Sequence, residues 1–424
     1  MNKLYLFDRR LFTDRSGIDY ILSIFVNLYL CIQLFDVSRN ALLLPGSVHS
    51  LMGLTRDVSL YGVLIFLLFK KQFKIHSYLY PLIVLVGLLP LVISIGAVID
   101  GTKVVSIANV VQYMFLFLKP ILFLFILYNL DYFYVFRKEN LIKTFIGFLV
   151  FLVLFSFFIY FFFPSLIIHF NIANRIGLGN MSVQSGMYLC AYILCLYFFP
   201  FSKKLYNWFC ILVLMAGILL SVCSTGILCM IFVTGIFLFD PNTRRRSLFL
   251  VSFATIFLIL LVIRYYDLFK PFMDYFRGKA EDVIDLIINF GSDNKTQSSS
   301  FSAREMEIQN MLENNNQPID YLFGHGYFSV NVPEEMVENG YYDLYFDCGL
   351  YGVFVLLLVY IKYGLKSIKL FFEKKNVLGI CFLVAVALFM VTLAVTVLST
   401  LLLSFIMLFY FIFIEKSSPM IESD

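Results

Sequence analysis

The segment "SAREMEIQNMLENNNQPIDYLFGHG" holds the first group of residues whose types and spacing could do chemistry. Ser302 and Glu305 have the spacing of a helix-capping pair, so we expect a short helix that begins at Ala303 and carries Arg304 in its first turn. Free backbone N–H groups there favour an anion, and a guanidinium adds paired hydrogen bonds to a phosphate. The pattern predicts a phosphate site, with a solvated surface arginine as the alternative.

Two further features suit a polar substrate. The stretch "LFGHGYF" places Gly324 and Gly326 around His325, and such glycines permit a tight turn with close backbone approach. Upstream, "NRIGLGNMSVQSG" places Arg175 among small and polar residues, where it suits a phosphate or a sugar hydroxyl. An interfacial arginine that anchors a helix is the alternative for Arg175.

A third segment, "VENGYYDLYFDCGLYGVF", supplies carboxylates. Glu338 and Asp343 are expected close to a membrane surface, where partial burial makes a carboxylate a better general base. Asp343 and Asp347 are spaced to share one face of a helix. Solvated acidic residues at the top of a helix are the alternative.

The elements that must position these residues are transmembrane helices. The chain is 61% hydrophobic and 14% charged, whereas a soluble domain carries about a quarter charged residues. Several runs approach the roughly 20 apolar residues that cross a bilayer, so the sequence predicts an all-α polytopic membrane protein. We expect twelve spans, centred near residues 27, 61, 88, 119, 152, 191, 213, 231, 256, 355, 386 and 405.

The bounds of some of these spans are less clear from hydropathy alone. The second is the weakest, because Arg56 and Asp57 are expected to crowd its start. The apolar run from Tyr206 to Phe239 is too long for one span and has basic residues at both ends, which predicts two short spans that meet at "SVCSTG". The run from Val377 to Ile414 is divided in the same way.

Most of the 32 Lys and Arg residues fall on one side when the N-terminus is cytoplasmic, which predicts that both termini are cytoplasmic. Residues 1–265 then hold nine spans and a small outer loop at 164–183. Residues 266–345 form a large outer loop, and residues 346–424 hold three spans. The expected core contains almost no acidic residues, and Lys119 is its one clear mid-span charge; this argues against an ion-coupled transporter. No metal-ligand or cofactor motif is present in the sequence, so we expect neither group.

Together these segments resemble the O-antigen polymerase and ligase family, the Wzy-type polymerases and WaaL-type ligases. The large loop is similar to that family's outer loop in its serine run at 298–300, its Arg304 and its glycine pair. Arg175 and Gly186 match the R-x10-G pattern of the polymerases. The turn "SVCSTG" is similar to the family's Ser-Arg-Gly turn, but Thr225 stands where the arginine is usual.

The last segment distinguishes the two branches. Ligases have His-Asn, then a tyrosine or leucine pair, then Gly-Leu-x-Gly. This chain has an acidic residue in the histidine position, which is more similar to polymerases; its matching residues are Glu338-Asn339, Tyr341-Tyr342 and Gly349-Leu350-Tyr351-Gly352.

The resemblance implies a metal-independent GT-C-type glycosyltransferase on the periplasmic side of a bacterial inner membrane. Its donor is a glycan on undecaprenyl diphosphate and its acceptor a repeat unit on the same carrier. For that chemistry we assign Arg175 and Arg304 to the diphosphate, and Glu338, or else Asp343, as the base. We expect sugar and backbone contacts from the remaining residues of these motifs, namely Gly186, Gly324, His325, Gly326, Tyr327, Asn339, Tyr341 and Tyr342.

Membrane lipid, a chain-length regulator and a flippase are the expected partners, and nucleic acid is not. Three alternatives stay open. One is a purely structural scaffold in a polysaccharide export complex, which would leave the two arginines without a role. A ligase would transfer the glycan to lipid A-core, and a lipid-linked oligosaccharide flippase would move its substrate without chemistry.

Overall fold

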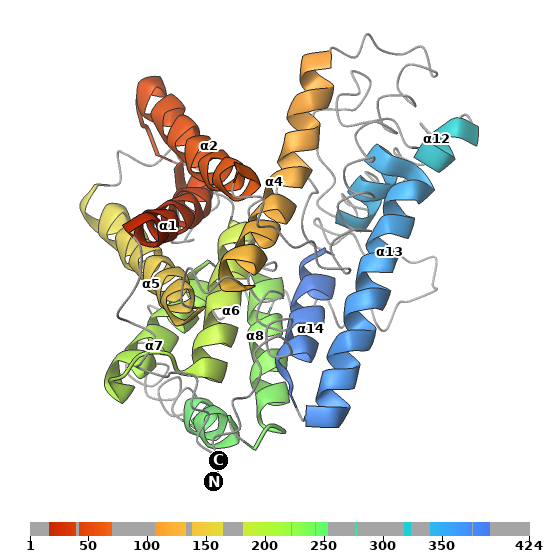
Figure 1. Ribbon diagram of the computed structural model, residues 1–424. Helices are drawn as coiled ribbons and strands as arrows, with labels where there is room; N and C mark the ends of the chain where they lie inside the picture. Colours follow the sequence, from red (N-terminus) through yellow and green to blue (C-terminus); the bar gives the residue numbers. More distant parts are fainter. Residues whose placement is uncertain are drawn as a thin grey trace, which may run out of the picture.

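The computed structural model describes residues 17–39, 42–69, 107–132, 138–163, 181–221, 223–241, 243–252, 277, 318–323, 340–374 and 376–390. This part of the chain is all-helical (Figure 1). Its helices are α1 (Gly17–Arg39), α2 (Gly46–Phe69), α4 (Ile107–Tyr132), α5 (Lys138–Phe162), α6 (Met181–Phe198), α7 (Lys204–Leu220), α8 (Ser224–Phe237), α12 (Pro318–Phe323), α13 (Gly340–Lys374) and α14 (Leu378–Met390).

Several of these helices are built for a bilayer. Within the described ranges, three are long and apolar enough to cross a membrane: Asp19–Asp36 of α1, the whole of α2 and the whole of α5. Shorter apolar helices accompany them, at Leu118–Leu130, Val183–Phe198, Lys204–Leu220, Thr225–Phe237 and Leu378–Phe389. The fold therefore suggests a membrane protein.

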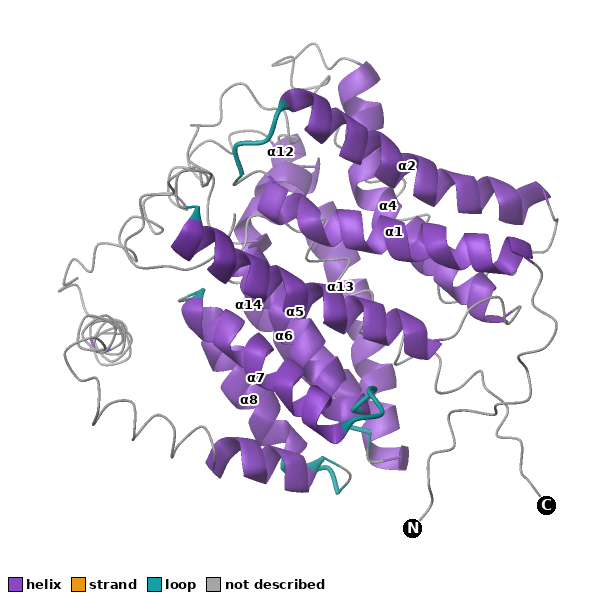
Figure 2. Cartoon of the chain, turned by 90° about the vertical axis from the view of Figure 1, so that its left-hand side faces the viewer, coloured by secondary structure: helices purple, strands orange, loops and turns teal. Residues whose placement is uncertain are grey.

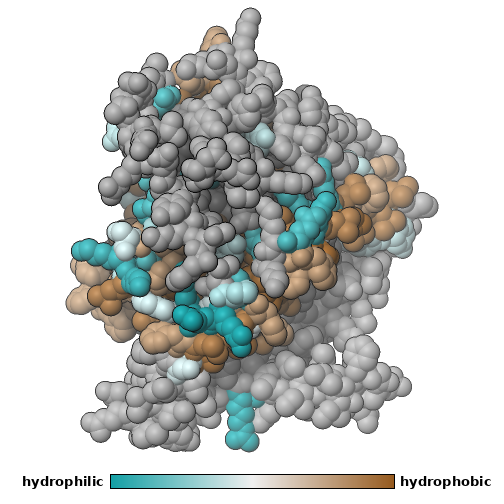
Figure 3. All heavy atoms as spheres, turned by 60° about the horizontal axis from the view of Figure 1, so that its bottom comes forward, coloured by the Kyte–Doolittle hydropathy of each residue, from teal (hydrophilic) through white to brown (hydrophobic). Residues whose placement is uncertain are grey.

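The outward faces of the long apolar helices support this interpretation. α2 and α5 expose large hydrophobic side chains along their length, among them Leu51, Leu54, Ile65, Phe151 and Phe158. Figure 3 shows one end of the molecule, where the described residues form hydrophobic areas beside hydrophilic patches. In water such surface would be costly, whereas lipid tails cover it without penalty.

α6 is the central helix of the described core. Every residue from 183 to 196 is buried, because α5, α7, α8 and α14 contact α6 from different sides (Figures 1 and 2). A helix that is apolar all round, as this one nearly is, belongs in such a position. The Tyr192 hydroxyl and the Thr234 hydroxyl, 2.7 Å apart, join α6 to α8 within this core.

The predicted division of the long apolar run is confirmed. α7 ends at Leu220 and α8 begins at Ser224, so two helices meet at "SVCSTG". The Ser221 hydroxyl donates to the Ile218 carbonyl over 2.7 Å, which satisfies a polar group at the buried end of α7. Cys223 is extended and redirects the chain into α8.

Most of the other expected spans coincide with helices, and some lie outside the described residues. Helices lie at the predicted centres near residues 27, 61, 119, 152, 191, 213, 231, 355 and 386. The spans expected near 88 and 405 lie outside the described residues, and only 244–252 of the span near 256 is described. The prediction that Arg56 and Asp57 crowd the start of the second span is wrong. α2 begins at Gly46, so both charges lie in its middle, where partners on α1 and α4 make them tolerable.

α13 is bent at one residue. Gly349 has φ 61° and ψ −159°, a conformation that interrupts the helix and that only glycine adopts readily. The short helix α12, which begins with proline at its first position, contacts α13. The Gly-Leu-x-Gly segment thus marks a backbone bend, and the helix continues beyond it.

Gly349→Ala is expected to lower the free energy of unfolding by about 1–3 kcal/mol, because an L-residue is strained at this φ and ψ. Gly364→Ala is the matched control on the same helix. Its new Cβ would meet Leu383 Cδ1 at 3.7 Å, an ordinary contact, so no loss is expected. Titration of both purified variants with SDS measures the difference, and equal stabilities would contradict the strain.

Candidate functional site

The structure places four of the predicted site residues on described backbone. Gly186 lies buried in α6, and Tyr341, Tyr342 and Asp343 lie in the first turn of α13. Asp343 and Asp347 share α13 ahead of its bend, which agrees with their helical spacing. The other predicted site residues lie outside the described residues: Arg175, Arg304, Gly324, His325, Gly326, Tyr327, Glu338 and Asn339.

Two motifs that are distant in sequence meet at the starts of α6 and α8. Ser185, the neighbour of Gly186, lies directly against Gly226 of "SVCSTG": a Cβ built on Gly226 would be 1.8 Å from Ser185 Oγ. Only glycine allows this approach. Ser185 is fully buried, and its hydroxyl has no hydrogen-bond partner among the described residues. The end of the R-x10-G segment and the turn between α7 and α8 therefore belong to one junction.

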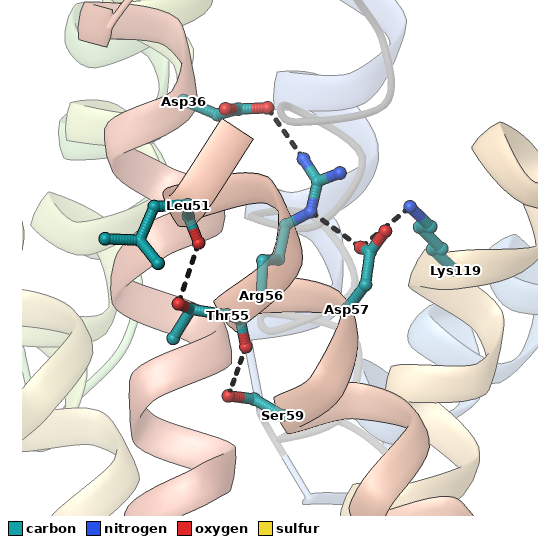
Figure 4. Close-up of polar contacts among 7 residues, drawn as sticks. All are labelled: Asp36, Leu51, Thr55, Arg56, Asp57, Ser59 and Lys119. Atoms are coloured by element: carbon teal, nitrogen blue, oxygen red, sulfur yellow. Dashed lines mark hydrogen bonds and ion pairs between the residues drawn. The ribbon is translucent and has the colours of Figure 1, made fainter. Parts of the chain in front are cut away.

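A second polar feature lies between α1, α2 and α4. Arg56 donates from Nη1 to Asp36 Oδ2 over 2.9 Å and from Nε to Asp57 Oδ1 over 3.0 Å. Lys119 Nζ donates to the same Asp57 oxygen over 2.9 Å. Figure 4 shows the four side chains in one continuous chain that joins the three helices. We call these residues, Asp36, Arg56, Asp57 and Lys119, the charge cluster.

The charge cluster is largely shielded from solvent. The Asp36, Arg56 and Lys119 side chains are only 17–18% exposed, and that of Asp57 is 36% exposed. Tyr29 of α1, which is buried, packs on Phe123 of α4 with ring centroids 4.8 Å apart. Charges attract one another more strongly in such surroundings than in water, and an unpaired one is costly. The cluster carries two positive and two negative charges, so its formal charges balance.

The charge cluster corrects the prediction of a core with one isolated charge. Lys119 is paired, and its partner Asp57 lies within a candidate membrane span. The pairing could not be predicted from sequence, because its partners lie on three different helices and no single helix shows them together. The available signal was the Arg56–Asp57 dipeptide in one apolar run and a lysine in another.

No protein-family model matches the chain, and no curated protein matches it.

Metal ligands do not gather in the described ranges. No group of three or more His, Cys, Asp or Glu residues there could hold a metal ion. The described cysteines are all free thiols, and all but Cys31 are buried. Within this part of the chain, the two candidate functional features are the helix junction at Ser185 and Gly226 and the charge cluster.

Proposed function

We propose that the protein is a surface-polysaccharide polymerase of the O-antigen type, a metal-independent GT-C-type glycosyltransferase of about twelve spans. The observation that supports it is the contact of Gly226 with Ser185. In the resemblance, the small outer loop and the turn between two spans are separate motifs. Here the residues that end one of them pack on the residues that begin α8, as expected if both serve one site.

The reaction is the one that the resemblance implies, and the residues above are assigned to its steps. The acceptor sugar hydroxyl attacks the anomeric carbon of the donor glycan, and the carbon–oxygen bond to the diphosphate breaks. The leaving undecaprenyl diphosphate takes the electron pair, and Arg175 and Arg304 stabilise its growing negative charge. Glu338 accepts the proton of the acceptor hydroxyl, with Asp343 as the second candidate. Tyrosine rings at Tyr327, Tyr341 and Tyr342 contact sugar faces.

Arg175→Ala, Arg304→Ala and Glu338→Gln are each expected to insert normally yet lose glycan transfer by about a hundredfold or more, the effect of removing one group that stabilises a transition state. The assay supplies purified protein in liposomes with undecaprenyl-diphosphate-linked repeat units and follows the ladder of longer glycans on a gel. Lys369→Ala, an exposed residue on α13, is the control. Full activity in all three variants would contradict the assignment.

A ligase is distinguished in the same liposomes. Transfer that needs lipid A-core, with no ladder in its absence, would replace the polymerase with a ligase. The acidic Glu338 in the histidine position favours the polymerase.

The charge cluster favours a second candidate of another class, a lipid-linked oligosaccharide flippase. Paired charges inside a membrane often mark a transport pathway, and this removes the objection that the core lacks them. Movement of a labelled lipid-linked oligosaccharide across the liposome bilayer, without a ladder and abolished by Asp57→Asn, would support transport instead.

A further inference from the structure

The connection between α6 and α7 packs against the helix that starts at residue 244, and together they form one corner. Arg246 Nη1 donates to the carbonyls of Leu196 and Tyr197, over 3.0 and 3.1 Å, and so satisfies the end of α6. The Arg246 guanidinium carbon lies 4.4 Å from the centre of the Phe199 ring. Arg246 is thus committed to holding the corner together.

An aromatic stack extends the same corner. Trp208 packs edge-on against Phe199, with ring centroids 5.5 Å apart, and against Phe249, with centroids 4.8 Å apart. These contacts fix the start of α7 against the helix that begins at 244. Residues that flank the stack on the two segments are therefore neighbours in space.

The connection before α7 is fixed by a buried amide. Asn207 Nδ2 donates to the Phe201 carbonyl over 2.6 Å and to the Lys203 carbonyl over 3.2 Å, and the Phe201 N–H donates to Asn207 Oδ1 over 2.9 Å. This holds the backbone of the connection in one shape. Asp240, which lies just before the helix that starts at residue 244, is buried, and its carboxylate accepts a hydrogen bond from the Thr243 hydroxyl over 3.1 Å.

Four cations stand on the outside of this corner: Lys203, Lys204, Arg244 and Arg245, which we call the basic corner. All four are exposed. Large hydrophobic side chains lie beside them, with Leu205 83% and Phe239 82% exposed. Figure 3 views this end of the molecule and shows hydrophilic patches set among hydrophobic side chains. Cations beside exposed apolar groups fit the boundary between lipid head groups and lipid tails.

We propose that the basic corner binds the phosphate head group of an anionic phospholipid on the cytoplasmic side of the membrane. The cations pair with the phosphate, and Leu205, Phe239 and Phe249 contact the acyl chains. Charge complementarity carries the proposal: four cations are exposed on the surface, whereas the carboxylate of Asp240 is buried, accepts a hydrogen bond from Thr243 and acts on the charge of Arg246. The proposal does not depend on the proposed reaction.

Trp208 makes the test direct, because it is the only tryptophan of the chain. The full-length protein is placed in phosphatidylcholine liposomes that contain the same fraction of brominated lipid, either phosphatidylglycerol or phosphatidylcholine. Bromine quenches tryptophan emission at short range. We expect brominated phosphatidylglycerol to quench Trp208 more, with an apparent preference of about fivefold, the ratio for one engaged cation.

Charge variants locate the preference. Lys203→Gln with Lys204→Gln, and Arg244→Gln with Arg245→Gln, are each expected to reduce it, while the Lys203→Arg and Lys204→Arg pair keeps it. Lys369→Gln, which removes an exposed cation from α13, should leave it unchanged.

Three results would overturn the proposal. Equal quenching of the unaltered protein by the two brominated lipids would do so without any variant. A preference that survives both neutralised pairs would place the lipid elsewhere. Loss of the preference on adding inorganic phosphate at constant ionic strength would mean that the corner takes a free anion.

Discussion

Asp57→Asn is expected to lower the free energy of unfolding by about 2–3 kcal/mol, one of the largest effects of any single change here. The substitution keeps the shape of the side chain but leaves Arg56 and Lys119 with one carboxylate between them. Breaking a fully buried ion pair costs about 3–5 kcal/mol. The partial exposure of Asp57 lowers that figure, because solvent screens the remaining charges. Unfolding in SDS, followed by circular dichroism, gives the value.

A second substitution shows whether the loss comes from charge. Lys119→Met in the Asp57→Asn background restores the balance of charges, with Arg56 still paired to Asp36. It should recover most of the lost stability, and the coupling is read from the two single variants and the double. Glu373→Gln, which breaks an exposed pair with Lys369 on α13, is the control and should cost about 0.5 kcal/mol or less. Additive effects of Asp57→Asn and Lys119→Met would contradict the cluster.

Gly226→Ala is expected to cost about 3 kcal/mol or more, at the upper end for overpacking in a core. The new Cβ would be 1.8 Å from Ser185 Oγ and 3.0 Å from Ser185 Cβ, and Ser185 is fully buried. α6 and α8 must therefore separate, or the side chain of Ser185 must leave its position. SDS titration measures the loss of stability, and the glycan ladder measures any loss of transfer.

Two further variants show whether the effect of Gly226→Ala comes from its contact with Ser185. Gly235→Ala lies on the same helix with nothing within 4 Å of its new Cβ, so it should be neutral or slightly stabilising. Ser185→Ala in the Gly226→Ala background removes the overlapping oxygen and should recover part of the stability. If Gly226→Ala behaves like Gly235→Ala, the close approach of α6 and α8 is not present in the protein.

The helices could be predicted from sequence because the length and apolar composition of each run are enough to indicate a helix that is buried in protein or lipid. The division at "SVCSTG" needed only length and the basic residues at both ends of the run. The start of α2 could not be predicted in this way. Arg56 and Asp57 resemble solvated residues until Asp36 and Lys119, on two other helices, are brought to within 3 Å.

In the candidate site, too, features that depend on local sequence could be predicted, and features that depend on packing between helices could not. Helical spacing was enough to put Asp343 and Asp347 on one helix, since that depends on local geometry alone. The contact between Gly226 and Ser185 depends on how α6 packs against α8, and no local pattern encodes it. The bend at Gly349 had only a partial signal in the two glycines of the Gly-Leu-x-Gly segment, which do not by themselves encode a change of direction.

The charge cluster also bears on how the chain enters the membrane during synthesis. α2 reaches the membrane with Arg56 and Asp57 in its middle, and each charge at a helix centre costs about 2.5–3.5 kcal/mol to insert. Asp36 of α1 is already present, but Lys119 follows Asp57 by 62 residues. Until α4 is made, Asp57 lacks its second cation, and α2 gains from waiting at the edge of the translocation channel. We therefore expect α2 to leave that channel only after α4 has been made.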